Sequence, residues 1–267
     1  MGAVLLAAVV TPLRDDGQAL DEDAIDPLVR YLQAGGCDGV LCCGSVGEGI
    51  LLTPAERRRA AAAFRAACAG QLIVHAGCQT TADTCALAAH AAETGADGVA
   101  VIPPPYFPLS DDALTEHFVQ AARACTPAPF YLYAFTGRSG YPLPVHVAAR
   151  VAERADNLVG MKISEPSFEQ VKPYLDLGLD IYVGADGVIP EALAAGAAGA
   201  ASGLASAFPE RIAALVADPT AQRAEDIVRL REELLARGDM IAVLKDELGR
   251  RGLPVRRDVR APLQPVS

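Results

Sequence analysis

The chain has 267 residues and a net charge of -10 at pH 7, and 51% of its residues are hydrophobic. A chain of this length buries about three quarters of its unfolded surface, so it can form one large domain or two small ones. The acidic balance argues against a nucleic-acid partner, because such surfaces need basic clusters. The run Arg57–Arg59 is the nearest to one, and its helical surroundings indicate a solvent-exposed helix end.

Residues 1–10 are apolar, and a polar turn follows them at residues 14–17. The stretch is too short to span a membrane and no basic region precedes it. We therefore interpret it as a first β-strand and expect a cytoplasmic protein that does not bind a membrane.

The seven cysteines are odd in number and contain no C-x-x-C pair. Most lie in apolar strand segments or Ala-rich helical segments, where cysteine behaves as a small hydrophobic residue. A disulfide framework is not expected in a chain of this size. Cys42 and Cys43 are adjacent at the end of a predicted strand, and we interpret them as packing residues rather than a redox or metal site.

Eight short apolar runs alternate with helical segments along the chain. Each run is apolar on both faces, which is typical of parallel strands covered by helices. The predicted strands are Val4–Val9, Gly39–Cys43, Gln71–His75, Gly98–Ile102, Phe130–Tyr133, Leu158–Lys162, Asp180–Val183 and Gly199–Ser202.

The segments between these strands carry helix signals. One has Thr53 as its N-cap, Pro54 at the first helical position and Glu56 three residues after the cap, which is a capping box. Eight strand–helix pairs predict a (β/α)8 TIM barrel over residues 1–220, and a doubly wound open sheet is the alternative. Residues 221–267 are predicted as a C-terminal helical extension that packs on the barrel within a single structural domain.

In a (β/α)8 barrel, active sites gather at the C-terminal ends of the strands. Lys162 ends the sixth predicted strand, Tyr133 ends the fifth, and the turn Gly44–Glu48 follows the second. Only three of the 23 basic residues are lysines. This scarcity favours a function for Lys162, although a lysine that merely extends its charged end into solvent is the alternative.

A lysine in an apolar barrel mouth is disfavoured as the cation, so its neutral amine becomes available to attack a ketone. The iminium that forms is an electron sink for making or breaking the adjacent carbon–carbon bond. The hydroxyl of Tyr133, one strand away, could carry the proton transfers. The Gly-rich turn offers backbone N–H groups that could hold a carboxylate beside the ketone.

Five segments spread over the whole chain are TPLRDDG, GSVGEGILLTPAERR, YAFTGRSG, GMKIS and GADGVIPEALAAGAAGAASGLASAFPE. Together they resemble the dihydrodipicolinate synthase and N-acetylneuraminate lyase family of class I aldolases. The resemblance implies an enzyme that needs no metal and no organic cofactor. It also implies an oligomer, and we expect a homotetramer or a homodimer.

The resemblance further implies roles for six residues. Lys162 would form a Schiff base with pyruvate or a related 2-oxo acid, and Tyr133 would shuttle protons. The hydroxyl of Ser45 and the N–H groups of Ser45 and Val46 would bind the carboxylate of the 2-oxo acid. Arg138 would help to place a carboxylate of the second substrate, and the backbone at Ala201 would line the pyruvate site.

Two positions depart from the synthase pattern. The synthases have two adjacent threonines where this chain has Ser45 and Val46, and a tyrosine where it has Phe107 after Tyr106. We interpret both changes as the loss of a hydroxyl that would pass a proton onward from Tyr133. They favour an aldolase or dehydratase of a 2-keto-3-deoxy sugar acid, a 4-hydroxy-2-oxo acid or a specialised metabolite. True 4-hydroxy-tetrahydrodipicolinate synthase activity and a non-catalytic 2-oxo-acid-binding barrel are the alternatives.

Three further side chains are candidates at the barrel mouth. Asp186 could contact the second substrate or cap the helix that follows it, and capping is the preferred interpretation. Glu48 is interpreted as tying loop N–H groups together, and His75 ends the third strand and could reach the pocket. No two histidines share ligand spacing on one element, so no metal site is predicted. The remaining histidines lie on helical segments and are expected at the surface: His90, His117 and His146.

Overall fold

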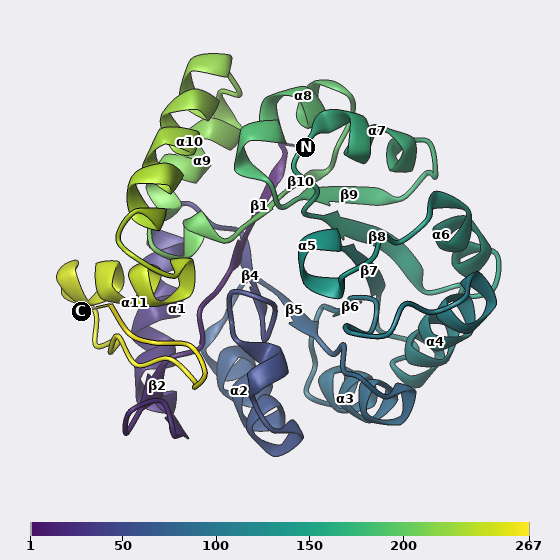
Figure 1. Ribbon diagram of the computed structural model, residues 1–267, viewed down its shortest axis with the longest axis horizontal. Helices are drawn as coiled ribbons and strands as arrows, with labels where there is room; N and C mark the ends of the chain where they lie inside the picture. Colours follow the sequence, from purple (N-terminus) through teal and green to yellow (C-terminus); the bar gives the residue numbers. More distant parts are fainter. Residues whose placement is uncertain (1, 267) are drawn as a thin grey trace.

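Eight parallel strands close into a barrel, and helices surround it in the computed structural model, which describes residues 2–266 (Figure 1). Strand β1 pairs with β4 on one side and with β10 on the other, so the sheet has no free edge. This confirms the (β/α)8 barrel and excludes the open sheet. The barrel strands are β1 (Val4–Ala8), β4 (Gly39–Cys42), β5 (Gln71–His75), β6 (Gly98–Val101), β7 (Phe130–Ala134), β8 (Leu158–Ile163), β9 (Asp180–Val183) and β10 (Gly199–Ser202).

Each barrel strand begins at the residue predicted for it, and no strand end differs from its prediction by more than one residue. The short strands β2 (Leu13–Arg14) and β3 (Ala19–Leu20) form a separate hairpin after β1. The α-helices are α1 (Ile25–Ala34), α2 (Pro54–Ala67), α3 (Thr81–Glu93), α4 (Asp111–Ala124), α5 (Thr136–Ser139), α6 (Val145–Ala152), α7 (Phe168–Leu175), α8 (Ile189–Ala194), α9 (Pro209–Ala217), α10 (Ala221–Leu235) and α11 (Met240–Arg250). None of the helices in the part of the chain described is long and apolar enough to cross a membrane.

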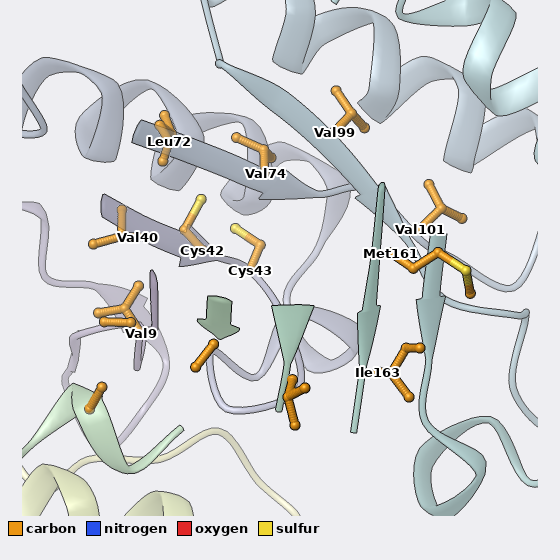
Figure 2. Packing of buried hydrophobic residues seen from close by; sticks show 14 of the residues in the cluster. Val9, Val40, Cys42, Cys43, Leu72, Val74, Val99, Val101, Met161 and Ile163 are labelled. Atoms are coloured by element: carbon orange, nitrogen blue, oxygen red, sulfur yellow. The ribbon is translucent and has the colours of Figure 1, made fainter. Parts of the chain in front are cut away.

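Side chains alternate between two apolar layers along the strands, because successive residues of a strand point to opposite faces. Figure 2 shows part of the outer layer, which packs between strands and helices and includes Val40, Cys42, Leu72, Val74, Val99, Val101, Met161 and Ile163. The inner layer fills the barrel and comprises Leu6, Leu41, Ile73, Ala100, Tyr131, Tyr182 and Ala201. Since Met161 and Ile163 belong to the outer layer, the residue between them, Lys162, is directed into the barrel.

The expectation that the basic run is a solvated helix end is wrong for its first residue. Arg57 is 2% exposed, whereas Arg58 and Arg59 are exposed. The guanidinium of Arg57 donates to the carbonyl oxygens of His75 at 2.6 Å and Gly77 at 2.9 Å. The spacing explains the burial, because the inward face of α2 consists of residues 57, 60, 61 and 64.

The expectation of a surface position is also wrong for His117, which is 3% exposed on α4. Its Nδ1 lies 2.9 Å from the hydroxyl of Thr81 on α3, so the imidazole is packed between neighbouring helices. Burial lowers the pKa of His117 to about 4. The histidine is therefore neutral at physiological pH and serves the α3–α4 packing.

The chain after α9 returns to the barrel. Helix α10 packs against α9 and the turn after β9, and α11 follows it. The C-terminal tail, drawn in yellow in Figure 1, then lies against the β2–β3 hairpin. The approach is close there, since a Cβ added to Gly17, whose φ is +79°, would lie 2.1 Å from the carbonyl oxygen of Val259.

Candidate active site

Lys162 lies inside the barrel, near the C-terminal end of β8, and is 6% exposed. Its Nζ is 4.5 Å from the centroid of the Tyr133 ring. The two residues are partners in the register between β7 and β8, so the pairing of these strands sets their distance. The inner layer of the barrel lines a small cavity beneath the lysine, and Lys162 is part of its wall. The amine therefore combines an apolar floor with an aromatic neighbour.

The hydroxyl of Tyr133 meets the turn after β4. Its Oη lies 3.3 Å from Oγ of Ser45, and the tyrosine is 1% exposed. The side chain of Val46 points to a different neighbour, since a Cβ added to Gly203 would lie 3.0 Å from Cγ2 of Val46. The structure therefore brings Lys162, Tyr133 and Ser45 together. The hydrogen-bond partner of the tyrosine is the hydroxyl of residue 45.

His75 supports Tyr133 from the side. The two rings are edge to face, with centroids 5.8 Å apart, and Nδ1 of His75 lies 3.1 Å from the carbonyl oxygen of Cys43. Burial and then the positive charge of Arg57 lower the pKa of His75 to about 3. The imidazole is therefore neutral and holds the tyrosine ring by packing.

Glu165 is a residue of the site that the sequence analysis missed. It is 6% exposed, and its Oε1 accepts hydrogen bonds from the backbone N–H of Thr136 at 2.8 Å and from its hydroxyl at 2.9 Å. These bonds join the loop after β8 to α5, the short helix that carries Arg138. A carboxylate three residues after Lys162, just past a strand end, was the available signal.

Arg138 lies at the rim of the barrel mouth. It is exposed on α5, and its Cζ is 5.9 Å from the centroid of the Phe135 ring. The Phe135 ring in turn faces Tyr133, with centroids 6.3 Å apart. The guanidinium is therefore one aromatic ring away from the tyrosine and is accessible from solvent.

Asp186 follows β9 and is 7% exposed. It does not cap a helix: neither the short 3-10 turn it begins nor α8 has a side-chain cap hydrogen bond, so the preferred interpretation was wrong. Its Oδ1 has no hydrogen-bond partner among residues 2–266. Burial raises the pKa of Asp186 to about 6, although the Ser202 hydroxyl and the positive charges of Arg231 and Lys162 act in the opposite direction.

The last two predicted site residues lie in different environments. Ala201 is 1% exposed on β10 and belongs to the inner layer beneath Lys162. Phe107 is 70% exposed and packs edge to face against Tyr106, which is 81% exposed. The aromatic pair is thus on the surface of this chain and not in the buried site.

Glu48 ends the turn that carries Ser45, and its carboxylate ties parts of the chain together. It is 2% exposed, and it accepts a hydrogen bond from the backbone N–H of Arg260 at 2.6 Å and one from Nζ of Lys245 at 2.5 Å. Within the residues that the structure describes, no group of three or more His, Cys, Asp or Glu side chains could hold a metal ion.

Comparison with known proteins gives consistent matches over the whole chain. The model of the dihydrodipicolinate synthetase family matches residues 2–267. The chain is 34% identical over 269 residues to 4-hydroxy-tetrahydrodipicolinate synthase 1 of Streptomyces coelicolor, covering 97% of this chain and 87% of the relative. It is 33% identical over 264 residues to a DapA-like lyase of Halobacterium salinarum, covering 94% and 84%. The structure superimposes on Proteus mirabilis N-acetylneuraminate lyase with a TM-score of 0.92 at 29% identity, covering 99% and 93%.

The raised pKa of Asp186 predicts a pH-dependent stability. Because the folded state favours the protonated carboxyl, the stability that this group contributes is present below its ordinary pKa and is lost as the pH rises through about 6. The change Asp186→Asn removes the titratable carboxyl and with it this loss. When the pH is raised from 5 to 8, we expect the unfolding free energy of the variant to rise by about 1–2 kcal/mol relative to that of the parent.

Urea unfolding of both proteins at the two pH values measures this difference. The matched control is Asp180→Asn, which removes an exposed carboxylate at the start of β9. A constant difference for Asp186→Asn would show that the carboxyl is already ionised in the folded protein at pH 5.

Proposed function

Because this chain belongs to the dihydrodipicolinate synthetase family, and is thus a class I, Schiff-base-type aldolase or lyase, we propose that it forms its Schiff base between Lys162 and a pyruvate-type 2-oxo acid. One observation carries this assignment to Lys162. Its amine is buried 4.5 Å from the ring of Tyr133, whose hydroxyl is 3.3 Å from that of Ser45. The other two lysines lack this setting, since Lys172 is exposed and Lys245 is paired with Glu48.

In the proposed reaction, the amine of Lys162 adds to the ketone carbon, and loss of water from the carbinolamine leaves an iminium. The Tyr133 hydroxyl donates the proton that leaves with the ketone oxygen as water, which leaves a tyrosinate beside Ser45. The tyrosinate then takes a proton from the carbon next to the iminium, which gives an enamine. The enamine attacks the carbonyl carbon of an aldehyde, and the Tyr133 hydroxyl returns the proton to the aldehyde oxygen. Hydrolysis of the new iminium frees the product and the lysine, and the reverse sequence cleaves the same bond.

The carboxylate of the 2-oxo acid is proposed to bind at the turn after β4. The hydroxyl of Ser45 and the N–H groups of Ser45 and Val46 would receive it, since a Gly-rich turn presents such donors to an anion. The backbone of Ala201 would line the opposite side, on the inner layer beneath the lysine. This arrangement puts the ketone carbon between the turn and Nζ of Lys162.

For the second substrate we propose an aldehyde or sugar acid that bears a hydroxyl and a carboxylate. Asp186 is buried with Oδ1 unpartnered among the described residues, so it can accept a hydrogen bond from a substrate hydroxyl. Arg138 at the rim can bind a carboxylate. The favoured reaction is aldol cleavage, aldol formation or dehydration of a 2-keto-3-deoxy sugar acid. Phe107 would contact this substrate only from a neighbouring subunit, because it is exposed in its own chain.

A second candidate is the synthase reaction, condensation of pyruvate with aspartate semialdehyde. Its support is the 34% identity with the Streptomyces coelicolor synthase and the Ser45–Tyr133 contact. The missing hydroxyl is then the one at Phe107. A non-catalytic 2-oxo-acid-binding barrel is disfavoured, because Lys162, Tyr133, Ser45 and Arg138 are all retained.

We also propose that the protein is a cytoplasmic homotetramer or homodimer. The exposed Tyr106–Phe107 pair supports an oligomer, because large aromatic side chains at the surface are typical of interfaces. Residues 1–220 and the extension 221–267 are proposed to form one structural domain. The buried contact of Glu48 with Lys245 supports this, since it joins the two parts.

Borohydride trapping tests the Schiff base. With pyruvate and borohydride we expect one stable adduct per chain, found by peptide mapping on the peptide that contains Lys162 and read by intact mass. Lys162→Met should abolish the adduct, whereas Lys172→Met, which changes the exposed lysine on α7, should leave it unchanged. Labelling of the Lys162→Met variant would contradict the assignment. Undiminished pyruvate binding by that variant, without turnover of any 2-oxo acid, would favour the non-catalytic barrel.

The role of the tyrosine hydroxyl is tested on two residues of β7. Tyr133→Phe should slow adduct formation about 10²–10⁴-fold, the usual contribution of general acid–base catalysis. Tyr131→Phe is the matched control, because Tyr131 lies on the same strand in the inner layer below the lysine. Rapid-quench trapping with pyruvate measures both rates. Equal losses in the two variants would assign the effect to packing rather than to proton transfer.

The two candidate reactions are separated by the condensation assay. We expect the parent to convert pyruvate and aspartate semialdehyde slowly, because Phe107 lacks the hydroxyl that the synthases have. Phe107→Tyr should then raise the rate, and Tyr106→Phe, which alters the neighbouring ring, should not. A parent rate equal to that of the Streptomyces coelicolor synthase, measured side by side, would overturn the preference for another partner.

A further inference from the structure

The turn that carries Ser45 ends in an unusual backbone conformation. Glu48 has φ 57° and ψ 22°, in the left-handed region that side chains other than glycine rarely adopt. Such a conformation persists only where surrounding contacts hold it. The contacts of the Glu48 side chain are therefore part of what shapes this turn.

Both oxygens of Glu48 bind the C-terminal extension. Oε1 accepts a hydrogen bond from Nζ of Lys245 on α11, and Oε2 accepts one from the backbone N–H of Arg260 in the tail. Nζ of Lys245 also donates to the carbonyl oxygen of Asp258 at 2.7 Å. We call this set the Glu48 clamp: the Glu48 carboxylate, Nζ of Lys245 and the N–H of Arg260.

The Glu48 clamp contributes little net stability to the contact between its two segments. The side chains of Glu48 and Lys245 are both 0% exposed, and the desolvation free energy of two buried charges can equal or exceed their electrostatic attraction. Burial accordingly lowers the pKa of Lys245, although the charge of Glu48 opposes this. Apolar side chains could hold the two segments together equally well, but apolar packing is not directional. The hydrogen bonds to the carboxylate also fix the orientation of the Glu48 side chain.

The turn from Ser45 to Glu48 has little conformational freedom. The N–H of Glu48 donates to the carbonyl oxygen of Ser45 at 3.2 Å, and the hydroxyl of Thr11 donates to the carbonyl oxygen of Gly47 at 2.7 Å. The turn is also tight, since a Cβ added to Gly49 would lie 1.8 Å from the carbonyl oxygen of Cys43. A shift of Glu48 is therefore transmitted to the N–H groups and the hydroxyl at Ser45.

We propose that the Glu48 clamp is a positioning device through which the C-terminal extension orients the carboxylate-binding turn at Ser45. Glu48 and Lys245 are positioning residues in this reading and touch no substrate. The inference rests on the proposed function, because it assumes that the turn receives the carboxylate of a 2-oxo acid. According to the proposal, α11 and the tail contribute to recognition of the substrate carboxylate in addition to covering the barrel.

The test compares two ketones that differ in the carboxylate. Pyruvate carries it, and methyl pyruvate is the neutral ester. The quantity measured is the rate of borohydride trapping at Lys162 per unit concentration, expressed as the ratio of pyruvate to methyl pyruvate. A general loosening of the barrel lowers both rates, whereas a misplaced turn lowers only the rate for pyruvate, so the ratio separates positioning from stability.

The main variant is the double change Glu48→Gln with Lys245→Met. It removes both charges together, because removing only the lysine would leave a buried carboxylate without its counter-ion and endanger the fold. We expect the ratio to fall about tenfold, the effect of one lost hydrogen bond to a charged group. Glu48→Gln alone keeps the size of the side chain but leaves the buried Lys245 without its counter-ion, so it can also lower the stability. It should nevertheless lower the ratio, which does not depend on a general loss of stability.

The matched control is Arg237→Met. Arg237 pairs with Asp246 and Glu247, the two residues that follow Lys245 on α11, but it does not contact Glu48. It should leave the ratio at the parent value even if it lowers the melting temperature.

The proposal is overturned if both Glu48 variants keep the parent ratio, or if Arg237→Met lowers it by the same factor. Absence of any adduct in the parent would instead overturn the proposed function and the inference with it.

Discussion

The pleat of one strand inside a closed barrel is the constraint on which the site depends. Because Met161 and Ile163 pack outward against the helices, Lys162 between them must point inward, above the inner layer of the barrel and beside the ring of Tyr133. A shift of β8 by one residue would expose the lysine to the helix layer and bury two apolar side chains in the mouth. The same hydrophobic alternation that stabilises the fold therefore directs the amine of Lys162 into the barrel.

The polar groups around this amine are held mostly by backbone and hydroxyl partners. Arg57 is bound to carbonyl oxygens and His75 stays neutral, so the two together support the wall behind Tyr133 without a carboxylate. Glu165 accepts both donors of Thr136 and fixes the short helix at the rim. Asp186 keeps an oxygen without a partner among the described residues, which distinguishes it from a purely structural carboxylate. The site thus has an inner part whose polar groups are hydrogen-bonded within the protein, and Asp186, which has an oxygen available to a ligand.

The sequence predicted this barrel well because its signals are local. Short apolar runs bounded by Gly and helix caps mark each strand start, and family motifs mark Lys162, Tyr133 and Ser45. The contacts that escaped prediction are made between segments distant along the chain. The inward face of α2 reveals Arg57 in hindsight, since residues 57, 60, 61 and 64 share one helical stripe. No local pattern, however, shows that Glu48 pairs with Lys245, or that the hydroxyls of Ser45 and Tyr133 lie within hydrogen-bond distance.

The pairing of Glu48 with Lys245 spans 197 positions of the chain. During synthesis the lysine of β8 and the tyrosine of β7 emerge long before α11 and the tail. A growing polypeptide on the ribosome thus contains Lys162 before the turn at Ser45 has gained its contacts with α11 and the tail. The proposed capture of a keto acid would in this respect be a property of the finished molecule, acquired at the end of translation.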